Sequence, residues 1–353
     1  MKNQAIQYLA LDVHQATTSA TLRDAFGAIR QRATLRTTAR DLVSLTRGAG
    51  ARVHVALEEG TQAQWVHDLL EPHAERVVVW RARDLGGNKN DRLDVDRLSE
   101  LLRMGSLTPV FHRVANVRTL RELTRSYVTL VEDATRLMLR IKAIFRARAI
   151  PAKGIRIYSS AHRQEWLRLL DERGVRMRAA ALYRQLDLTM ELRHRAKAAM
   201  LAEARRQSAW KILTSIPFFG PIRSALLLAI VITPHRFRTK RALWPYAGLA
   251  VVSRSSGDHE VDGARLRRRR RRPLTRGLNP NHNPILKAVF KGAANAAALK
   301  AGPLRERFEA SVRRGVSPDL AKVTLARTIA SVMLTLWKKG ELWDPSKLTM
   351  QPT

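Results

Sequence analysis

The chain has 353 residues, and its 64 basic and 30 acidic side chains give a formal charge of +34. A charge of that size repels itself unless a polyanion is bound, so we expect a cytoplasmic protein that handles nucleic acid. Cysteine is absent, which excludes disulfides, thiolate zinc sites, iron–sulfur clusters and cysteine nucleophiles. The start of the chain lacks a signal-peptide pattern, and we find no apolar run near the roughly 20 residues that cross a bilayer, so we expect no membrane partner.

The first hundred residues alternate between strand and helix patterns, as in an α/β domain. The predicted strands are Ile6–Val13, Thr18–Arg23, Ile29–Arg36, Arg52–Leu57 and Arg76–Trp80. The predicted helices are Thr38–Leu45, Trp65–Leu70 and Asp91–Met104. Three consecutive strands followed by alternating helices and strands predict a mixed sheet of the ribonuclease-H type.

The middle of the chain has the apolar spacing of long helices. One helix is predicted over Asn116–Arg148, and a second helical stretch over Ala161–Ser208 with a break at Gly174. Apolar residues in the second stretch are sparse between charges. That pattern suits either an exposed hairpin or coiled coil that pairs with another chain, or a helix packed on its own domain.

The last third is predicted to be mostly helical. Helices are expected within Ile212–Ile232, around the sequence P-F-F-G-P, and over Lys240–Leu249, Lys287–Lys300 and Leu320–Lys338. Ser253–Pro284 is expected to be a polar loop rich in arginine. The chain therefore divides into three predicted domains: an α/β domain with its trailing helix over 1–155, a helical segment over 156–208, and a mostly helical domain over 209–353.

Acidic residues are rare here, so the places where they gather are informative. Asp12 ends the first predicted strand, Glu58 ends the fourth, and Asp91 and Asp94 are three residues apart at a helix start. In a ribonuclease-H-like sheet the first and fourth strands are neighbours, and the helix after the fifth strand approaches their ends. The four carboxylates could therefore converge on one or two divalent ions. Magnesium prefers such hard oxygen ligands, and two ions about 4 Å apart stabilise both oxygens of a phosphodiester displacement.

Each of these acids also has a plainer interpretation. The pair at the helix start could be favourable charges in a first turn. Glu59 is a rival to Glu58, although it should point to the opposite face of the strand end. Asp96 is expected on the solvated side of its helix. Asp12 is the hardest to explain otherwise, because a carboxylate inside a buried strand is costly without a positive partner.

The spacing of these acids, with G-N-K-N-D-R-L-D leading into L-S-E-L-L-R, resembles the DEDD-type insertion-sequence transposases. In that family a RuvC-like nuclease domain precedes a C-terminal transposase domain. The resemblance continues through I-P-F-F-G-P-I-R-S-A, R-F-R-T-K-R-A-L-W-P-Y-A-G-L, R-S-S-G and N-H-N-P-I-L-K-A-V-F. It implies that Asp12, Glu58, Asp91 and Asp94 bind Mg²⁺ or Mn²⁺.

The resemblance also implies a catalytic serine in a Ser-Gly sequence after Y-A-G-L. Ser256 matches that position, and the neighbouring Ser255 stays open as an alternative. Judged from the residues alone, R-S-S-G would be an ordinary loop, and serine needs a nearby base or metal to act as a nucleophile. The implied reaction is metal-assisted attack of Ser256 on a phosphodiester, through a phosphoserine intermediate, in a transposase that cuts and rejoins DNA.

The family is further implied to use a structured bridge RNA that pairs with donor and target DNA, which fits the large positive charge. A cluster of arginines is predicted to bind phosphate, and a solvated loop is the alternative. We do not expect a regular amphipathic element there, because Leu266 alone makes no apolar face. The predicted nucleic-acid-binding residues are Arg254, Arg265, Arg267, Arg268, Arg269, Arg270, Arg271 and Arg272.

Two positions depart from the family pattern. Phe218 stands where related chains carry a glycine, which favours apolar packing over close approach to DNA, and Gln15 stands where a lysine is common. Two rival functions remain: a RuvC-like nuclease that uses water and leaves Ser256 inert, and a nucleic-acid-binding protein without chemistry. We expect a dimer or tetramer, because exchange of four DNA strands needs several active sites.

Overall fold

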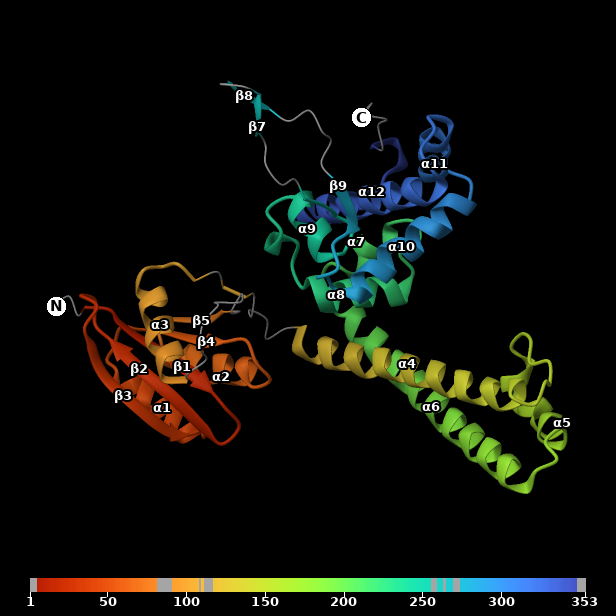
Figure 1. The fold of residues 1–353 in the computed structure, drawn as a ribbon, viewed down its shortest axis with the longest axis horizontal. Coiled ribbons are helices and arrows are strands. Elements are labelled where there is room, and N and C mark those ends of the chain that lie inside the picture. Colours follow the sequence, from red (N-terminus) through yellow and green to blue (C-terminus); the bar gives the residue numbers. More distant parts are fainter. Residues whose placement is uncertain are drawn as a thin grey trace. The chain divides into compact units, whose positions relative to one another are not determined.

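The structure is a computed structural model. It describes residues 5–80, 91–107, 109–110, 117–254, 259–262, 265–268 and 274–347, without the side chains of 91–93 and 253–276. The chain forms two compact units, Met1–Arg113 and Val114–Thr353, which we describe separately (Figure 1). The division into three domains at residues 155 and 208 stays a prediction.

The first unit contains a five-stranded sheet in the order β3-β2-β1-β4-β5. Its strands are β1 (Gln7–Val13), β2 (Thr17–Arg23), β3 (Ile29–Arg36), β4 (Val53–Glu58) and β5 (Arg76–Trp80). The first three strands are antiparallel neighbours, while β1, β4 and β5 run parallel. This mixed sheet confirms the predicted ribonuclease-H-like fold class.

Helices cover both faces of this sheet. Successive side chains of a strand point to opposite sides, so each face presents apolar side chains that a helix can cover. The helices are α1 (Ala39–Gly48), α2 (Ala63–Leu70) and α3 (Asp91–Arg103). One face presents large side chains such as Leu11 and Leu57, which pack against α1 and α2. The other face presents Ala10 and Ala56, which pack against Val95 and two leucines of α3. Small side chains on that face let α3 approach the sheet closely.

Two long helices begin the second unit as an antiparallel hairpin, visible in yellow and green in Figure 1. They are α4 (Arg118–Arg146) and α6 (Arg173–Arg205), joined through η3 (Arg156–Tyr158), η4 (Ser160–His162) and α5 (Arg163–Arg168). The buried Tyr183 of α6 donates a hydrogen bond to the carbonyl of Ile157 at 2.9 Å. The second helix is therefore packed on its own chain; pairing with another chain stays a prediction. The break in this stretch lies at residues 169–172, between α5 and α6, and Gly174 itself lies in the first turn of α6.

The rest of the second unit is a helical core with short connections, which confirms the mostly helical class. Its elements are α7 (Trp210–Ser215), α8 (Pro221–Val231), η5 (Pro234–Arg236), α9 (Lys240–Tyr246), α10 (Pro284–Leu299), α11 (Pro303–Arg313), α12 (Pro318–Lys339) and η6 (Pro345–Lys347). Leucine, alanine and phenylalanine side chains of α8, α10 and α12 fill the core. Helix α11, in which charged and apolar residues are interspersed, was not predicted from the sequence.

The last of these long helices, α12, has the length and apolar composition of a membrane-spanning helix. This apolar run was not predicted from the sequence. Its buried side chains, including Leu325, Ile329 and Met333, belong to the core of the unit. Packing against α10 therefore accounts for its composition.

Backbone pairing overturns the prediction that residues 253–284 form only a loop. Strand β6 (Val251–Arg254) pairs with β9 (Leu274–Leu278), and β7 (His259–Asp262) pairs with β8 (Arg265–Arg268), both antiparallel. A hairpin ladder needs only paired backbone groups, so β7 and β8 can pair without an apolar face. The arginines of the cluster thus lie partly on a strand.

One glycine of the second unit, Gly248, lies so close to the ring of His282 that there is no room for a Cβ atom. Gly248 has φ +65°, and a Cβ built on it would lie 2.6 Å from the ring carbon Cγ of His282. We expect Gly248→Ala to lower the free energy of unfolding by about 2–5 kcal/mol, from backbone strain and overpacking together. Gly340 is the matched control, because it also has positive φ but no described atom lies within 4 Å of an added Cβ.

Chemical denaturation measures this difference. Gly340→Ala should cost only about 1 kcal/mol, the conformational part of the penalty. Equal losses in the two variants would contradict the steric role assigned to His282.

Candidate metal centre

Two of the four predicted carboxylates end neighbouring parallel strands. Leu11 of β1 is in register with Leu57 of β4, so the next residues, Asp12 and Glu58, lie at the same edge of the sheet. Residues in register on parallel strands point to the same face. The preceding residues on that face, two positions earlier in each strand, pack against α3. Asp12 and Glu58 therefore share the face of the sheet that α3 covers.

Hydrogen bonds along β2 establish the direction of α3. Thr21 donates to the carboxylate of Asp96 at 2.7 Å, and Arg23 donates to the hydroxyl of Ser99 at 3.1 Å. Ser19 of β2 is paired with Asp12 of β1. Going from Ser19 to Thr21 and Arg23 therefore leads away from Asp12, and along the same direction the contacted residues of α3 go from Asp96 to Ser99. Helix α3 therefore starts at the carboxyl edge of β1 and β4 and runs back across the sheet.

The first turn of α3 thus brings the remaining two acids to this edge. Asp91 begins the helix and Asp94 follows one turn later, with an exposed side chain. The side chain of Asp91 lies outside the described residues. The Asp12 side chain is 23% exposed, and its Oδ2 is 3.3 Å from Nε2 of His14. Carboxylate oxygens are ligands suited to Mg²⁺ or Mn²⁺, although those of Asp12, Glu58 and Asp94 do not all lie within 4.8 Å of one another in the structure.

Other acids of this unit have structural partners. The carboxylates of Asp24, Glu75 and Glu100 form ion pairs with arginine side chains. Hydrogen bonds from Arg52 and Arg103 are the first causes that hold the pKa of Glu75 and Glu100 below their usual values. These acids stabilise the fold.

Asp96 differs from the expectation that it lies on the solvated side of its helix. Its carboxylate accepts from Nη2 of Arg32 at 2.7 Å and from Thr21, and it joins α3 to β2 and β3. The hydrogen bond from Arg32 is the first cause that lowers the pKa of Asp96. No local sequence signal reveals this pairing, because its partners are 64 and 75 residues away.

The anchoring of α3 predicts a pH-dependent stability. We expect Asp96→Asn to lower the free energy of unfolding by about 1–3 kcal/mol at neutral pH. Because folding depresses the pKa of Asp96, its contribution is full above the unfolded value of about 4 and is lost as the pH falls through the folded value. Urea titrations at neutral and acidic pH should show the gap between wild type and variant closing in acid. A gap that stays constant would contradict this role.

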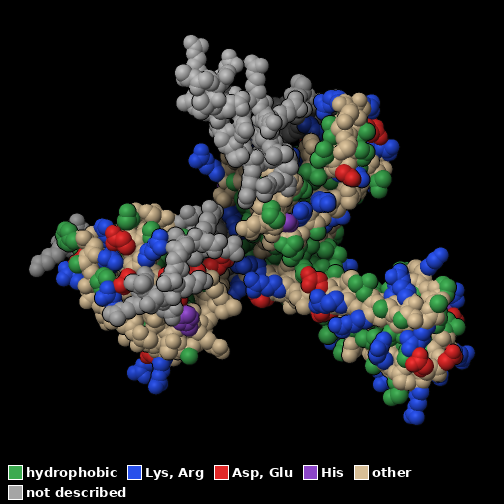
Figure 2. Space-filling view, in the orientation of Figure 1, with side chains coloured by type: hydrophobic (Ala, Val, Ile, Leu, Met, Phe, Trp, Pro, Cys, Tyr) green, Lys and Arg blue, Asp and Glu red, His purple; other side chains and the backbone are tan. Residues whose placement is uncertain are grey.

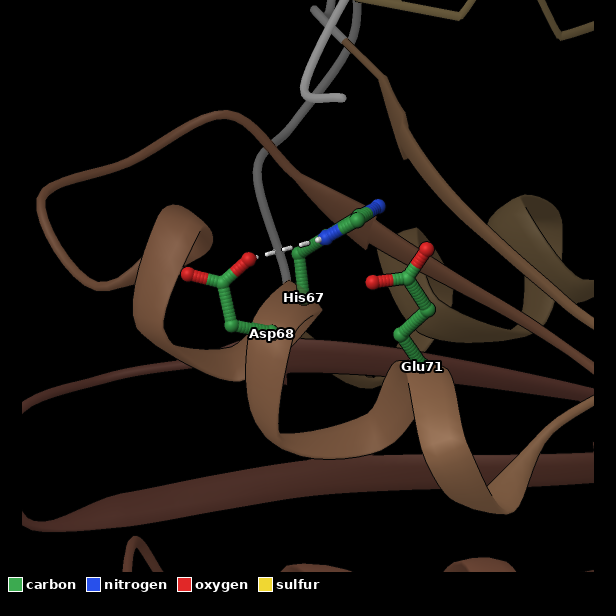
Figure 3. Close-up of side chains that lie close together, drawn as sticks. All are labelled: His67, Asp68 and Glu71. Atoms are coloured by element: carbon green, nitrogen blue, oxygen red, sulfur yellow. Dashed lines mark hydrogen bonds and ion pairs between the residues drawn. The ribbon is translucent and has the colours of Figure 1, made fainter. Parts of the chain in front are cut away.

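A second group of possible ligands lies on α2 and the turn after it. Among the described residues, one cluster has ligand atoms within 4.8 Å of one another, formed by His67, Asp68 and Glu71 (Figure 3). Nδ1 of His67 is 3.4 Å from Oδ1 of Asp68. Helix α2 packs on the face of the sheet opposite to the one that Asp12 and Glu58 share, so this cluster is separate from their site. The sequence analysis missed it, although its spacing on a helix could have indicated it.

The predicted residues of the second unit are only partly described. Ser256, Ser255 and Arg269–Arg272 lie outside the described residues. The backbone of Arg254 belongs to β6, and that of Arg265, Arg267 and Arg268 belongs to β8, while the side chains of all four lie outside the described part. Their roles stay predictions.

The backbone at Phe218 explains why a glycine suits this position. Its φ is +68°, in the left-handed region that favours glycine. The Phe218 ring packs at the edge of the helical core, as expected, and its carbonyl accepts a hydrogen bond from Arg223 at 2.7 Å. This turn between α7 and α8 is thus held by packing.

Comparisons with known proteins match both units. A DEDD transposase model of the IS110 type, described as a transposase, matches residues 9–148. A second model, described as the transposase IS116/IS110/IS902 family, matches residues 210–307. A relative from Streptomyces clavuligerus, named "Insertion element IS116 uncharacterized 44.8 kDa protein", is 27% identical over 136 residues. That alignment covers 38% of this chain and 31% of the relative, about a third of the relative's length. This chain belongs to the IS110 family of DEDD transposases of insertion sequences.

Proposed function

We propose that this protein is a recombinase that cuts and rejoins DNA at the ends of an insertion sequence, using divalent ions. The observation that carries the proposal is the common edge and face shared by Asp12, Glu58 and the start of α3. We assign Asp12, Glu58, Asp91 and Asp94 as the ligands. Their oxygens would hold Mg²⁺ or Mn²⁺, and a bound ion would supply charge stabilisation to the oxygens of the scissile phosphodiester.

We assign the covalent step to Ser256. Its Oγ would form a bond to phosphorus while the bond from phosphorus to the leaving sugar oxygen breaks. The hydroxyl proton passes to a base or water, and the leaving oxygen takes up a proton. Attack on the phosphoserine by a sugar hydroxyl of another strand reverses these changes and rejoins the DNA. Ser255 is the alternative nucleophile.

The partners in this proposal are donor DNA, target DNA and a structured guide RNA, in the cytoplasm. The formal charge of +34 supports it, because several phosphate backbones must be neutralised. We assign phosphate binding to the arginine cluster, Arg254, Arg265 and Arg267–Arg272. Several active sites are needed for strand exchange, so we propose a dimer or tetramer.

A nuclease that uses water is the second candidate. It is favoured by the fact that Asp12, Glu58 and α3 belong to one compact unit, whereas Ser256 is contributed by the other. Hydrolysis would require only the first unit's carboxylates.

One experiment tests the proposed function. The full chain is purified with its bound nucleic acid, the RNA is sequenced, and the complex is incubated with a plasmid that carries the ends of its own element. We expect Mg²⁺-dependent cut and rejoined products that disappear when EDTA is added. Products that persist in EDTA contradict the metal-dependent mechanism, and RNA unrelated to the element contradicts the guide.

A further inference from the structure

A pocket of about 230 Å³ lies on the first unit between the sheet and α3. Its polar lining includes Ser19 and Thr21 of β2 and Arg32 and Thr34 of β3, and Val95 of α3 contributes an apolar wall. None of these side chains belongs to the ligand set assigned above. The pocket therefore needs its own explanation.

The register of the sheet places this pocket beside Asp12. Ser19 of β2 is paired with Asp12 of β1 on one side and with Thr34 of β3 on the other. Directly opposed residues of antiparallel strands point to the same face. Asp12, Ser19 and Thr34 therefore form a row across the face that α3 covers. At the usual spacing of strands, Thr34 lies roughly 10 Å from Asp12.

The hydroxyl groups of Ser19 and Thr34 have no partner among the residues that the structure describes. The next polar side chains along the two strands, Thr21 and Arg32, both donate to the carboxylate of Asp96, each at 2.7 Å. Hydroxyl groups of serine and threonine are common donors to backbone phosphates. The end of the pocket nearest Asp12 thus offers two donors that the fold itself does not use.

Positive charge is also present on this face of β3. Arg30 and Arg32 form ion pairs with carboxylates, each at 2.7 Å, so their charges are balanced. Arg36, two residues after Thr34 and therefore on the same face, is exposed and forms no ion pair within the described part of the chain. Its charge can attract an anion toward the two hydroxyl groups.

We propose that Ser19, Thr34 and Arg36 bind a backbone phosphate of the DNA strand that is cut, a few nucleotides from the cleaved bond. The hydroxyl groups donate to phosphate oxygens, and Arg36 balances the negative charge. The identity of the ligand rests on the proposed function, in which the phosphodiester is cut at Asp12. A strand rises about 3.4 Å per nucleotide, so the roughly 10 Å to Thr34 corresponds to only a few nucleotides.

Cross-linking tests this contact without any cleavage. The chain has no cysteine, so Thr34→Cys introduces a single thiol that can carry a photoreactive azidophenacyl group. Thr34 is exposed on an edge strand, so the substitution spares the core. The labelled full chain is mixed in EDTA with DNA from an end of its element or with the RNA that copurifies with it, and is then irradiated.

Gln31→Cys is the matched control, because Gln31 is exposed on the same strand but points to the opposite face. We expect about tenfold more cross-linked DNA from Thr34→Cys than from Gln31→Cys, since the sheet separates the two positions. Equal yields from the two variants, or cross-links to RNA alone, would overturn the proposal.

A second comparison tests the role of the charge. Other basic side chains occur on the visible face of this unit (Figure 2), so the loss of a charge does not by itself identify the site. Arg36→Gln should lower the yield of DNA cross-links from Thr34→Cys several-fold. Arg40→Gln should not, because Arg40 is an exposed, unpaired arginine on α1, which covers the other face. An equal loss in both backgrounds would refute the assigned role of Arg36.

The outcome is independent of the proposed function. Specific cross-links in a protein that cuts no DNA would refute the recombinase and leave this site in place. Metal-dependent cutting by a protein whose Thr34→Cys variant gives no cross-links would refute this site alone.

Discussion

Asp12→Asn is expected to lower the rate of Mg²⁺-dependent DNA cleavage about 100- to 1,000-fold. The amide keeps the size of the side chain but removes the negative charge, and a catalytic ion contributes several kcal/mol of transition-state stabilisation. Glu58→Gln should have an effect of similar size, because Glu58 ends the neighbouring strand on the same face. Single-turnover cleavage of a labelled duplex measures both rates.

Glu59→Gln is the matched control for this prediction. Glu59 is exposed and follows Glu58 directly, so alternation at the strand end points it to the other side. Its backbone N–H donates to the carbonyl of Trp80 at 2.7 Å, which the substitution leaves in place. A rate lowered equally by Glu59→Gln and Glu58→Gln would indicate a general charge effect and would remove the basis for the proposed ligand set.

Ser256→Ala is expected to abolish a covalent protein–DNA adduct and to lower strand cutting by about 1,000-fold or more. The physical reason is that alanine lacks the oxygen that would bond to phosphorus. The adduct is trapped by denaturing the reaction and is detected as labelled DNA that migrates with the protein. Ser255→Ala should leave the adduct in place.

The same gels distinguish the two nucleophiles and the two mechanisms. An adduct lost only in Ser255→Ala would move the role to that residue. Cutting that continues at the wild-type rate in Ser256→Ala would favour hydrolysis by water, and the covalent step would have to be abandoned.

Much of the first unit could be predicted because its signals are local. Alternation over Arg52–Leu57 and the valine run within Arg76–Trp80 indicate strands, and the register between β1 and β4 shows that Asp12 and Glu58 share a face. The adjacency of β1 and β4 was predicted from the ribonuclease-H-like topology, and the structure confirms it. The position of α3 follows from the same topology.

Other features could not be predicted because they depend on residues far apart in the chain. The ion pair of Asp96 with Arg32 joins an edge strand to a helix 64 residues later. The ladders of β6 with β9 and of β7 with β8 are formed by backbone groups, so arginine-rich side chains gave no sign of them. The His67 cluster could not be predicted, because polar and charged residues such as His67, Asp68 and Glu71 are also common at the end of a helix without any ligand.

Titration of Mn²⁺ into the purified protein, followed by electron paramagnetic resonance of the free ion, tests the central claim most directly. We predict that the Asp12→Asn, Glu58→Gln double variant loses high-affinity Mn²⁺ binding, whereas the His67→Ala, Glu71→Gln double variant keeps it. Binding that survives the first pair of substitutions and disappears with the second would contradict the account.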